Sequence, residues 1–351
     1  MTTLRLGTRR SRLATTQSTH VADALRARGH AVELVQIVTE GDTSRASLSS
    51  LGGTGVFAAA LREALIAGEI DLAVHSLKDL PTAAHPDLTI AAIPRREDPR
   101  DAVVARDGVT LGELGPGARV GTGSPRRVAQ LAALGWDIEC RDIRGNVETR
   151  LQLVDDGLLD AVVLAHAGLR RLGLAGRVTE VLDPIQMLPA PGQGALAVEC
   201  RSERADVRAI VAALDDADTR ACVEAERAVL AVLEAGCSAP LGALGEIVED
   251  STPEGRTTLE LSLRAFVGSV DGAMELRRSV LGDPSDPSAT GRRLAELLLQ
   301  DGAADIMPAP RRRAPGREPG ASPSPPSPVH APSQPPSDTV PSHHLPLENT
   351  P

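Results

Sequence analysis

The chain has 351 residues, a formal net charge of −10, 42% hydrophobic residues and 1% aromatic residues. The length and the hydrophobic share are typical of a globular protein with two or three domains. The acidic balance repels phosphate backbones, and there are no rows of aromatic side chains on which bases could stack. We therefore expect no nucleic-acid partner.

Cysteine spacing and the N-terminal segment point to the cytoplasm. Cys140, Cys200, Cys222 and Cys237 show no CxxC or metal-ligand spacing, so we expect no metal. The N-terminus lacks a secretory hydrophobic region, and no apolar run approaches membrane-spanning length. We expect a cytoplasmic protein without membrane contact, in which a cysteine is either a small buried hydrophobe or a reactive nucleophile.

The first hundred residues alternate between strand and helix patterns. Strands are predicted at 4–7, 32–38 and 72–75, and helices at 11–28 and 57–67. Ser11 can cap the first helix at its N-terminus, and Gly29 suits its C-terminal end. This order is typical of β-α-β units, in which helices cover both faces of a sheet.

A second unit of the same kind follows residue 101. Its predicted strands are 102–105, 120–122, 138–141 and 161–164, and its predicted helices are 124–134 and 147–154. Ser124 is the N-cap of the first of these helices, and Pro125 occupies its first helical position. Residues 188–199 carry several prolines and glycines, which predicts a crossover followed by a strand at 195–198.

A third unit has a different order, which indicates an α+β domain. It begins with a helix at 219–233, continues with strands at 258–267 and 274–280, and ends with a helix at 289–299. From residue 308 onward the chain holds 14 of its 27 prolines and hardly any large aliphatic residue. Such a segment cannot bury enough apolar surface to offset its ordering entropy, so 308–351 is predicted to be a disordered tail.

Arginines gather at the turns that lead from strands into helices. They are Arg9, Arg126, Arg127, Arg144 and Arg150. A cation at a helix N-terminus opposes the helix dipole, whereas a bound anion would relieve both that repulsion and the unpaired backbone N–H groups. The guanidinium fork suits carboxylates, so these positions indicate a site for a carboxylate ligand. The alternative is that they are ordinary solvated surface residues.

Asp79 lies just past a buried strand, in V-H-S-L-K-D-L-P (residues 74–81), beside Lys78. At that place it could accept a hydrogen bond from a ligand N–H group or stabilise a cation. The alternative is an aspartate that forms a turn before Pro81.

Cys237 lies in E-A-G-C-S-A-P-L-G (residues 234–242), a loop of small residues after a helix. Small neighbours leave the thiol open to a reaction partner. The spacing alone leaves a structural cysteine as the alternative.

Seven segments occur in the order in which one enzyme family has them. They are residues 7–14, 74–81, 96–102, 121–127, 144–150, 188–195 and the Cys237 loop. Through them the chain resembles porphobilinogen deaminase, also called hydroxymethylbilane synthase, from about residue 4 to about residue 245, and more weakly to about residue 300. The proline-rich tail lies outside the resemblance.

The resemblance implies three domains, of which two are α/β lobes like those of periplasmic binding proteins and the third is smaller and α+β. The boundaries predicted for this chain are 1–95 with 189–213, then 99–185, then 217–306, followed by the tail at 308–351. The family joins four porphobilinogen molecules into the linear tetrapyrrole hydroxymethylbilane, with loss of ammonia at each addition. A monomer is expected.

The resemblance also assigns roles to residues. Cys237 matches the cysteine that carries a dipyrromethane cofactor through a thioether, and Asp79 matches the catalytic aspartate. Residues expected to contact the cofactor are Lys78, Thr122, Ser124, Arg126, Arg127, Arg144 and Arg150. Residues expected to contact the substrate are Arg9, Ser11 and Gln17. Because cations surround Asp79, we expect it to stabilise a cationic pyrrole rather than to act as a general acid.

One departure and two rival interpretations accompany the resemblance. Many relatives have lysine in a Gly-Gly-Lys-Gly loop where this chain has Thr54, which puts in doubt the cofactor role of that loop. A two-lobed protein that only binds a small anion would use the same arginines, but it would have no need of Cys237 or Asp79. A regulatory effector-binding domain is the other rival, although no DNA-binding element is attached.

Overall fold

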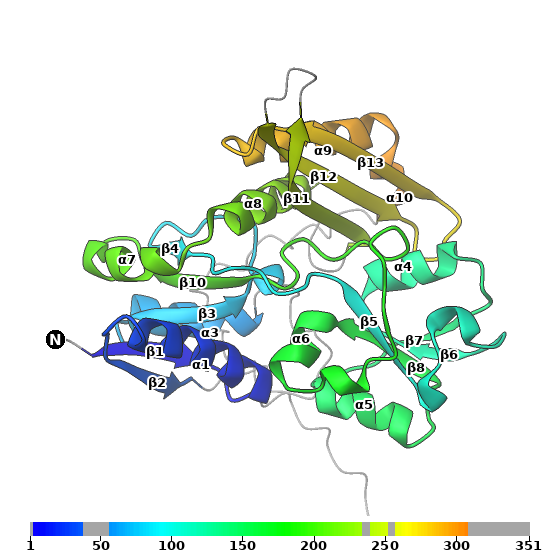
Figure 1. The fold of residues 1–351 in the computed structure, drawn as a ribbon, viewed down its shortest axis with the longest axis horizontal. Coiled ribbons are helices and arrows are strands. Elements are labelled where there is room, and N and C mark those ends of the chain that lie inside the picture. The colour runs from blue at the N-terminus through cyan, green and yellow to red at the C-terminus, as the bar shows by residue number, and fades with distance from the viewer. Residues whose placement is uncertain (1–2, 38–55, 234–238, 252–256, 308–351) are drawn as a thin grey trace, which may run out of the picture. The chain divides into compact units, whose positions relative to one another are not determined.

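The computed structural model describes residues 3–37, 56–233, 239–251 and 257–307 (Figure 1). Within that part of the chain, three sheets and the helices around them form an α/β fold. Thr54, Cys237 and the predicted tail at 308–351 lie outside the described residues.

The first sheet has the strand order β2-β1-β3-β10-β4. Its strands are β1 (Leu4–Thr8), β2 (Val32–Gln36), β3 (Leu72–Ser76), β4 (Leu88–Ala92) and β10 (Leu196–Arg201). β1 runs parallel to β2 and β3, whereas β10 returns from a distant part of the chain and pairs antiparallel with β3 and β4. Residues far apart in sequence therefore build one layer.

Helices cover both faces of the first sheet. They are α1 (Arg12–Arg26), α3 (Val56–Ile66) and α7 (Ala205–Val211). Leu25 of α1 and Val207 of α7 belong to one core cluster with strand residues, while Leu61 of α3 packs in a separate cluster. As predicted, Ser11 is the N-cap of α1, where its side chain accepts a hydrogen bond from the backbone N–H of Ala14. We call this sheet and these helices the first lobe.

The second lobe repeats this plan with the strand order β7-β6-β8-β5-β9. Its strands are β5 (Asp101–Ala105), β6 (Arg119–Gly121), β7 (Glu139–Arg141), β8 (Ala161–Ala165) and β9 (Glu180–Val181). Its helices are α4 (Pro125–Ala133), α5 (Val147–Asp155) and α6 (His166–Arg171). β6 pairs parallel with β7 and β8, and β5 pairs antiparallel with β8 and β9.

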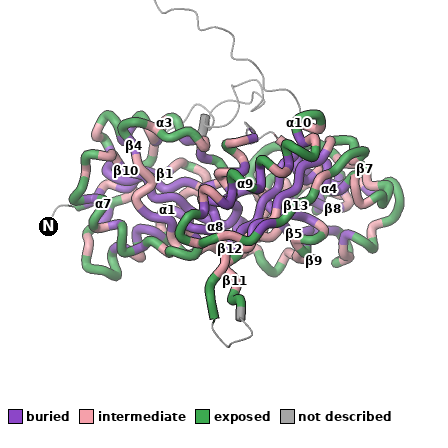
Figure 2. Tube along the Cα trace, turned by 90° about the horizontal axis from the view of Figure 1, so that it is seen from above, coloured by how far each residue is buried: buried purple, intermediate pink, exposed green. Residues whose placement is uncertain are grey.

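The third unit is an antiparallel sheet of β11 (Leu241–Ser251), β12 (Thr257–Gly268) and β13 (Glu275–Gly282). Its helices are α8 (Ala217–Val232), α9 (Pro287–Gln300) and α10 (Ala303–Ile306). Alternate residues of β12, such as Leu261 and Leu263, point to a core shared with Val229 and Leu294 of the helices. Figure 2 shows the buried residues along the strands and the inner faces of the helices.

Single 3₁₀ turns connect several of these elements. They are η1 (Leu77–Asp79), η2 (Arg106–Gly108), η3 (Leu111–Glu113), η4 (Ala175–Arg177) and η5 (Ala212–Leu214). η1 directly follows β3 and so places Lys78 and Asp79 at the end of a buried strand.

Two segments cross between the lobes, residues 93–100 and residues 182–195. They meet at Gly194, whose φ of +88° favours glycine and whose position leaves no room for a Cβ beside the main-chain oxygen of Glu97. Arg96 leaves the first crossing segment and forms a two-pronged ion pair with the fully buried Glu226 of α8, at 2.6 and 3.0 Å. The third unit is thereby tied to the crossing segments.

The elements predicted from sequence are present, with ends shifted by one to three residues. The α/β class, the α+β order of the third unit and the return of β10 after a crossover are confirmed. Six helices and strands had no prediction: β4, β9, β11, α6, α7 and α10. β11 carries Gly242 and Gly245, a residue type depleted in strands, and each sits against another backbone where a Cβ would not fit. The domain boundaries stay a prediction.

Candidate active site

The carboxylate of Asp101 is the centre of a buried polar cluster between the crossing segments and the second lobe. Asp101 begins β5 and is fully buried. Its Oδ2 accepts a hydrogen bond from Arg126 at 2.7 Å, and its Oδ1 accepts hydrogen bonds from Arg127 at 2.7 and 3.2 Å and from Gln193 at 2.8 Å. One carboxylate therefore aligns two guanidinium groups and an amide.

Electrostatics keep Asp101 ionised despite its burial. Burial alone would raise the pKa of this carboxyl, but the charges of Arg126 and Arg127 outweigh that effect and hold the pKa well below its usual range. The same burial lowers the pKa of Arg126, which Asp101 counteracts. Three charges thus sit together in a region that excludes water, with one positive charge in excess.

Arg126 and Arg127 reach Asp101 from the first turn of α4. They are 2% and 6% exposed, and each also donates to a main-chain carbonyl, of Leu188 at 2.6 Å and of Val163 at 2.9 Å respectively. The sequence predicted ligand-binding arginines at this helix start. The structure adds that a carboxylate of the chain itself already neutralises part of their charge.

Lys78 approaches the same cluster from the first lobe. Its Nζ donates to Oε1 of Gln193 at 3.3 Å, so the Gln193 side chain joins Lys78 to Asp101. Desolvation, together with the charges of Arg127 and Arg126, lowers the pKa of Lys78 to about 8, although Asp79 and Asp101 oppose the shift. Lys78 is also the only lysine of the chain.

Asp79 is the neighbour of Lys78 in η1 and is exposed to solvent. Its carboxylate is close enough to Lys78 to favour the charged ammonium group. The buried strand β3 and the turn that follows it therefore present an accessible carboxylate at the rim of a buried cationic cluster.

Arg150 and Arg144 extend the cationic region toward α5. Arg150 is half-buried and donates from Nε to the carbonyl of Gly145 at 2.9 Å. Desolvation lowers its pKa, and the charges of Arg127 and Arg144 lower it further, which places all three arginines within electrostatic reach of one another. Arg144 is exposed and pairs with Asp142 at 3.0 Å.

Thr122 and Ser124 form the turn between β6 and α4. Thr122 is 1% exposed, and its hydroxyl accepts a hydrogen bond from the backbone N–H of Ser124 at 3.3 Å. Ser124 is the N-cap of α4 as predicted, but among the described residues its hydroxyl makes no capping hydrogen bond. That hydroxyl is therefore available at the start of the helix that carries the arginines.

The predicted substrate residues lie around the first turns of α1. Arg9 is half-buried in the turn after β1. Gln17 is 5% exposed and donates at 3.0 Å to Ser76, the last residue of β3 before η1. This contact joins α1 to the turn that carries Lys78 and Asp79. The structure thus gathers Lys78, Asp79 and the arginines of the second lobe, and it connects Gln17 to them through β3.

Asp101 and Gln193 were not predicted as site residues. Both lie in segments that carried the family resemblance, residues 96–102 and 188–195, and that position was the only available signal. Cys237, the predicted cofactor anchor, lies outside the described residues. Over the ranges that the structure describes, no His, Cys, Asp and Glu side chains group as a metal site would need, and no helix has the length and hydropathy to cross a bilayer.

Comparison with known proteins agrees on one family. Residues 4–209 match the family model "Porphobilinogen deaminase, dipyromethane cofactor binding domain", and residues 220–300 match "Porphobilinogen deaminase, C-terminal domain". Porphobilinogen deaminase of Mycobacterium tuberculosis H37Rv is 59% identical over 304 residues, which cover 87% of this chain and 98% of that protein. The Mycobacterium avium protein of the same name is 58% identical, with coverage of 87% and 96%.

Solved structures with a similar arrangement include the methionine-binding protein MetQ and the lipoprotein Tp32 from Treponema pallidum. MetQ has a TM-score of 0.40 and 13% identity, and the match covers 60% of this chain and 89% of MetQ. Tp32 has a TM-score of 0.41 and 15% identity, with coverage of 60% and 90%.

Replacing Asp101 by Asn should destabilise the protein by about 3–5 kcal/mol, because two buried guanidinium groups would lose their counter-charge. Urea unfolding at constant m-value measures this change. Asp142→Asn is the matched control, since it removes the carboxylate of an exposed pair with Arg144 and should change stability little. A loss from Asp101→Asn no larger than that of the control would contradict the assigned role.

The amine of Lys78 should titrate with a midpoint near pH 8, because its folded-state pKa is lowered from 10.5 to about 8. As the pH rises through 8, the native amine loses its proton and reacts with acetic anhydride. Because the chain has one lysine, mass spectrometry of its peptide follows this reaction directly. The same peptide from protein in urea should show a midpoint about two units higher. Equal midpoints in the two states would refute the shift.

Proposed function

The chain belongs to the porphobilinogen deaminase family, and on that premise we propose that it joins four porphobilinogen molecules into the linear tetrapyrrole hydroxymethylbilane, with release of ammonia. The observation that supports this most directly is the buried cluster around Asp101. It concentrates positive charge in a protein of net charge −10. A growing chain of pyrroles that each carry acetate and propionate groups needs such a region.

The residues present fit a dipyrromethane cofactor. The Nε of Arg126 is buried and has no hydrogen-bond partner among the described residues. At the start of the same helix, the Ser124 hydroxyl makes no capping hydrogen bond with the described residues. Both are donors of the kind that a carboxylate accepts. We assign the attachment to Cys237, and we assign the contacts to Lys78, Thr122, Ser124, Arg126, Arg127, Arg144 and Arg150. When bound, the cofactor supplies the pyrrole carbon to which the first substrate unit is joined.

The arginines differ in what they can contribute. Arg126 and Arg127 are held by Asp101 and by carbonyl groups, so their positive charge is fixed in place and needs no rearrangement. Arg144 is exposed and its ion pair with Asp142 lies on the surface, so its side chain can turn toward the pyrrole chain as that chain lengthens. This combination suits a ligand that keeps one end fixed while it grows.

Asp79 is the proposed catalytic residue. Loss of ammonia from porphobilinogen leaves an electron-poor cationic pyrrole, and a carboxylate near the pyrrole N–H stabilises that charge. Its exposure at the end of η1 leaves it accessible to substrate, while Lys78 beside it faces the buried cluster. Arg9, Ser11 and Gln17, in the first part of α1 and the turn before it, are assigned to the incoming substrate.

Composition and family also support a proposal for the location, the oligomeric state and the partners of the protein. We propose that it acts in the cytoplasm as a monomer, with porphobilinogen as its partner and without nucleic acid or membrane. The low aromatic content and the acidic balance support the exclusion of nucleic acid.

Asp79→Asn should lower the rate of ammonia release from porphobilinogen by about 10²–10³-fold, because the amide cannot stabilise the cationic pyrrole. Single-turnover kinetics on cofactor-loaded protein measure this rate. Asp87→Asn is the control, since Asp87 is an exposed aspartate of the same lobe, with its side chain 64% exposed. A rate for Asp79→Asn within a few-fold of the control would remove Asp79 from the mechanism.

A further inference from the structure

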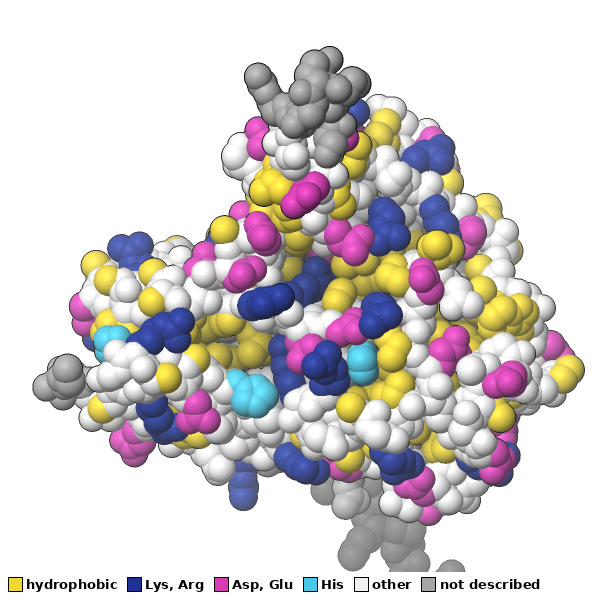
Figure 3. All heavy atoms as spheres, in the orientation of Figure 1, with side chains coloured by type: hydrophobic (Ala, Val, Ile, Leu, Met, Phe, Trp, Pro, Cys, Tyr) yellow, Lys and Arg dark blue, Asp and Glu magenta, His cyan; other side chains and the backbone are white. Residues whose placement is uncertain are grey.

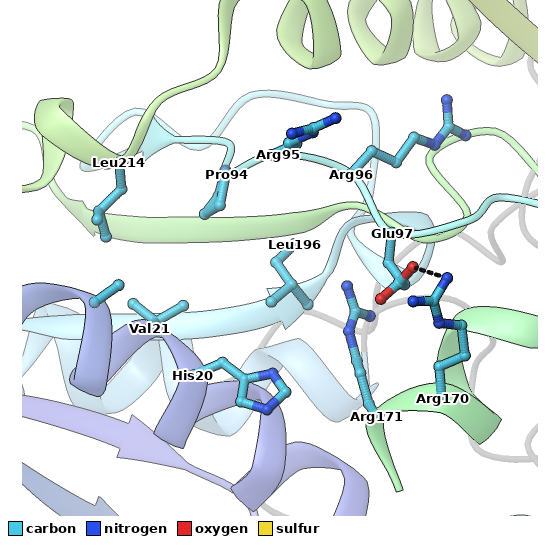
Figure 4. Close-up of a pocket in the computed structure, with 11 residues that line it drawn as sticks. His20, Val21, Pro94, Arg95, Arg96, Glu97, Arg170, Arg171, Leu196 and Leu214 are labelled. Carbon is cyan, nitrogen blue, oxygen red and sulfur yellow. Dashed lines mark ion pairs between the residues drawn. The ribbon is translucent and has the colours of Figure 1, made fainter. Parts of the chain in front are cut away.

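A cavity of about 590 Å³ lies between the sheet of the third unit, α4 of the second lobe and the crossing segment at 184–188. We call it the sheet pocket. It shares no residue with the site assigned above or with the cavity between the two lobes, in which Glu97 pairs with Arg170 (Figure 4). On the face drawn in Figure 3, hydrophobic side chains lie next to Lys and Arg side chains where the third unit meets the second lobe.

Strand alternation places three polar side chains of the sheet pocket on one face of the sheet. Leu263 and Ala265 of β12 pack in the core shared with the helices of the third unit, so Arg264 between them points to the opposite face. In the register of β12 and β13, Ser279 lies opposite Arg264, and Arg277 lies on the same face two residues earlier. Two guanidinium groups and a hydroxyl therefore line the pocket side by side.

Arg277 is held in place and still has donors to spare. Its guanidinium lies over the Phe266 ring, 4.9 Å from the centroid, and donates to the main-chain oxygen of Ile185 at 3.0 Å. Among the described residues, its paired carboxylate is Glu275, whose Oε1 lies 3.6 Å from Nε and so beyond hydrogen-bond distance. Because a guanidinium has five N–H donors, Arg277 can donate to an anion in the pocket without giving up the contact with Ile185.

The lining of the sheet pocket carries more positive than negative charge. Three arginines line it, whereas Glu275 is its acidic lining residue. Arg264 and Arg278 pair outside the lining, with Glu246 at 2.5 Å and with Asp301 at 2.7 Å. These arginine side chains are 33% and 48% exposed, and ion pairs at such positions contribute little stability. An incoming anion can therefore share them at low cost.

The opposite wall of the sheet pocket is apolar. It consists of Ala133 and Leu134 of α4 and of Pro184, Ile185 and Leu188 of the crossing segment. Ile185 is 74% exposed, more than any other large hydrophobic residue in the described part of the chain. Covering this side chain removes apolar area from water, which favours a ligand with an apolar body.

The sheet pocket adjoins the contacts that hold Arg126. The main-chain oxygen of Leu188, which lines the pocket, accepts hydrogen bonds from Arg126 at 2.6 Å and from Gln130 at 3.0 Å. The Gln130 side chain in turn accepts a hydrogen bond from the backbone N–H of Leu188 at 2.7 Å. A ligand that fills the pocket favours this arrangement of Leu188, in which Arg126 is held.

We propose that the sheet pocket is a binding site for a small organic anion with an apolar body. The anionic group lies between Arg264 and Arg277 and accepts charge-assisted hydrogen bonds from them, with the Ser279 hydroxyl as a further donor. The apolar body covers Ile185 and Leu134 on the opposite wall. The proposal does not depend on the proposed function, because none of these residues takes part in the reaction assigned above.

The test uses the full chain and a matched pair of fluorescent probes. 8-Anilinonaphthalene-1-sulfonate has a sulfonate on a flat apolar body, and N-phenyl-1-naphthylamine is the same body without the charge. In fluorescence titrations the sulfonate should bind at least about tenfold more tightly than the uncharged probe, because only the sulfonate accepts charge-assisted hydrogen bonds from the arginines.

Two variants test whether the sulfonate binds in the sheet pocket. Ile185→Glu places a negative charge on the apolar wall at an exposed position, and Arg277→Gln removes the held guanidinium. Each should weaken sulfonate binding at least about tenfold, and Arg277→Lys should lose less than Arg277→Gln. The controls are Leu158→Glu, at a side chain that is 57% exposed outside the pocket, and Arg292→Gln, at an exposed position of α9. Both controls should bind the sulfonate as the parent protein does.

Two results would overturn the proposal. If Ile185→Glu and Arg277→Gln both bind the sulfonate within a few-fold of their controls, the probe binds elsewhere. If the two probes bind the parent protein equally well, the arginines do not select an anion. Neither result bears on ammonia release from porphobilinogen, so the proposed function is tested separately.

Discussion

The ionised carboxylate of Asp101 is the constraint on which the rest of the site depends. It is fully buried, yet two guanidinium groups and an amide donate to it, so removing the carboxylate would leave two buried guanidinium groups without their counter-charge. Through it the start of α4, the start of β5 and the crossover at Gln193 occupy fixed positions. Gln193 also accepts a hydrogen bond from Lys78, which joins the first lobe to the same cluster. The two guanidinium groups therefore hold fixed positions before any ligand arrives.

Local signals in the sequence predicted the helices that carry the site. They did not predict Asp101 at its centre, because its partners are distant in sequence. Pro125 at the first helical position predicts the start of α4, and Ser11 predicts that of α1, because capping depends on nearby residues alone. Asp101 meets Arg126 across 25 positions and Gln193 across 92, and no pattern in a single sequence encodes such contacts. β4 also had no prediction, and it pairs with β10, which was predicted.

The arginines around Asp101 have their counter-charge within the chain itself. Asp101 fixes the guanidinium groups of Arg126 and Arg127, and one excess positive charge remains. This arrangement suits the attached cofactor proposed above. On the proposed function, this local positive charge lets a protein of net charge −10 bind acidic pyrroles.

The account as a whole depends on a cofactor attached to Cys237. The most direct test is the intact mass of the purified protein, combined with peptide mapping of the segment that contains Cys237. We predict a mass excess equal to two linked pyrrole units, located on that cysteine. An unmodified mass that persists after incubation with porphobilinogen would contradict the account and leave a two-lobed anion-binding protein in its place.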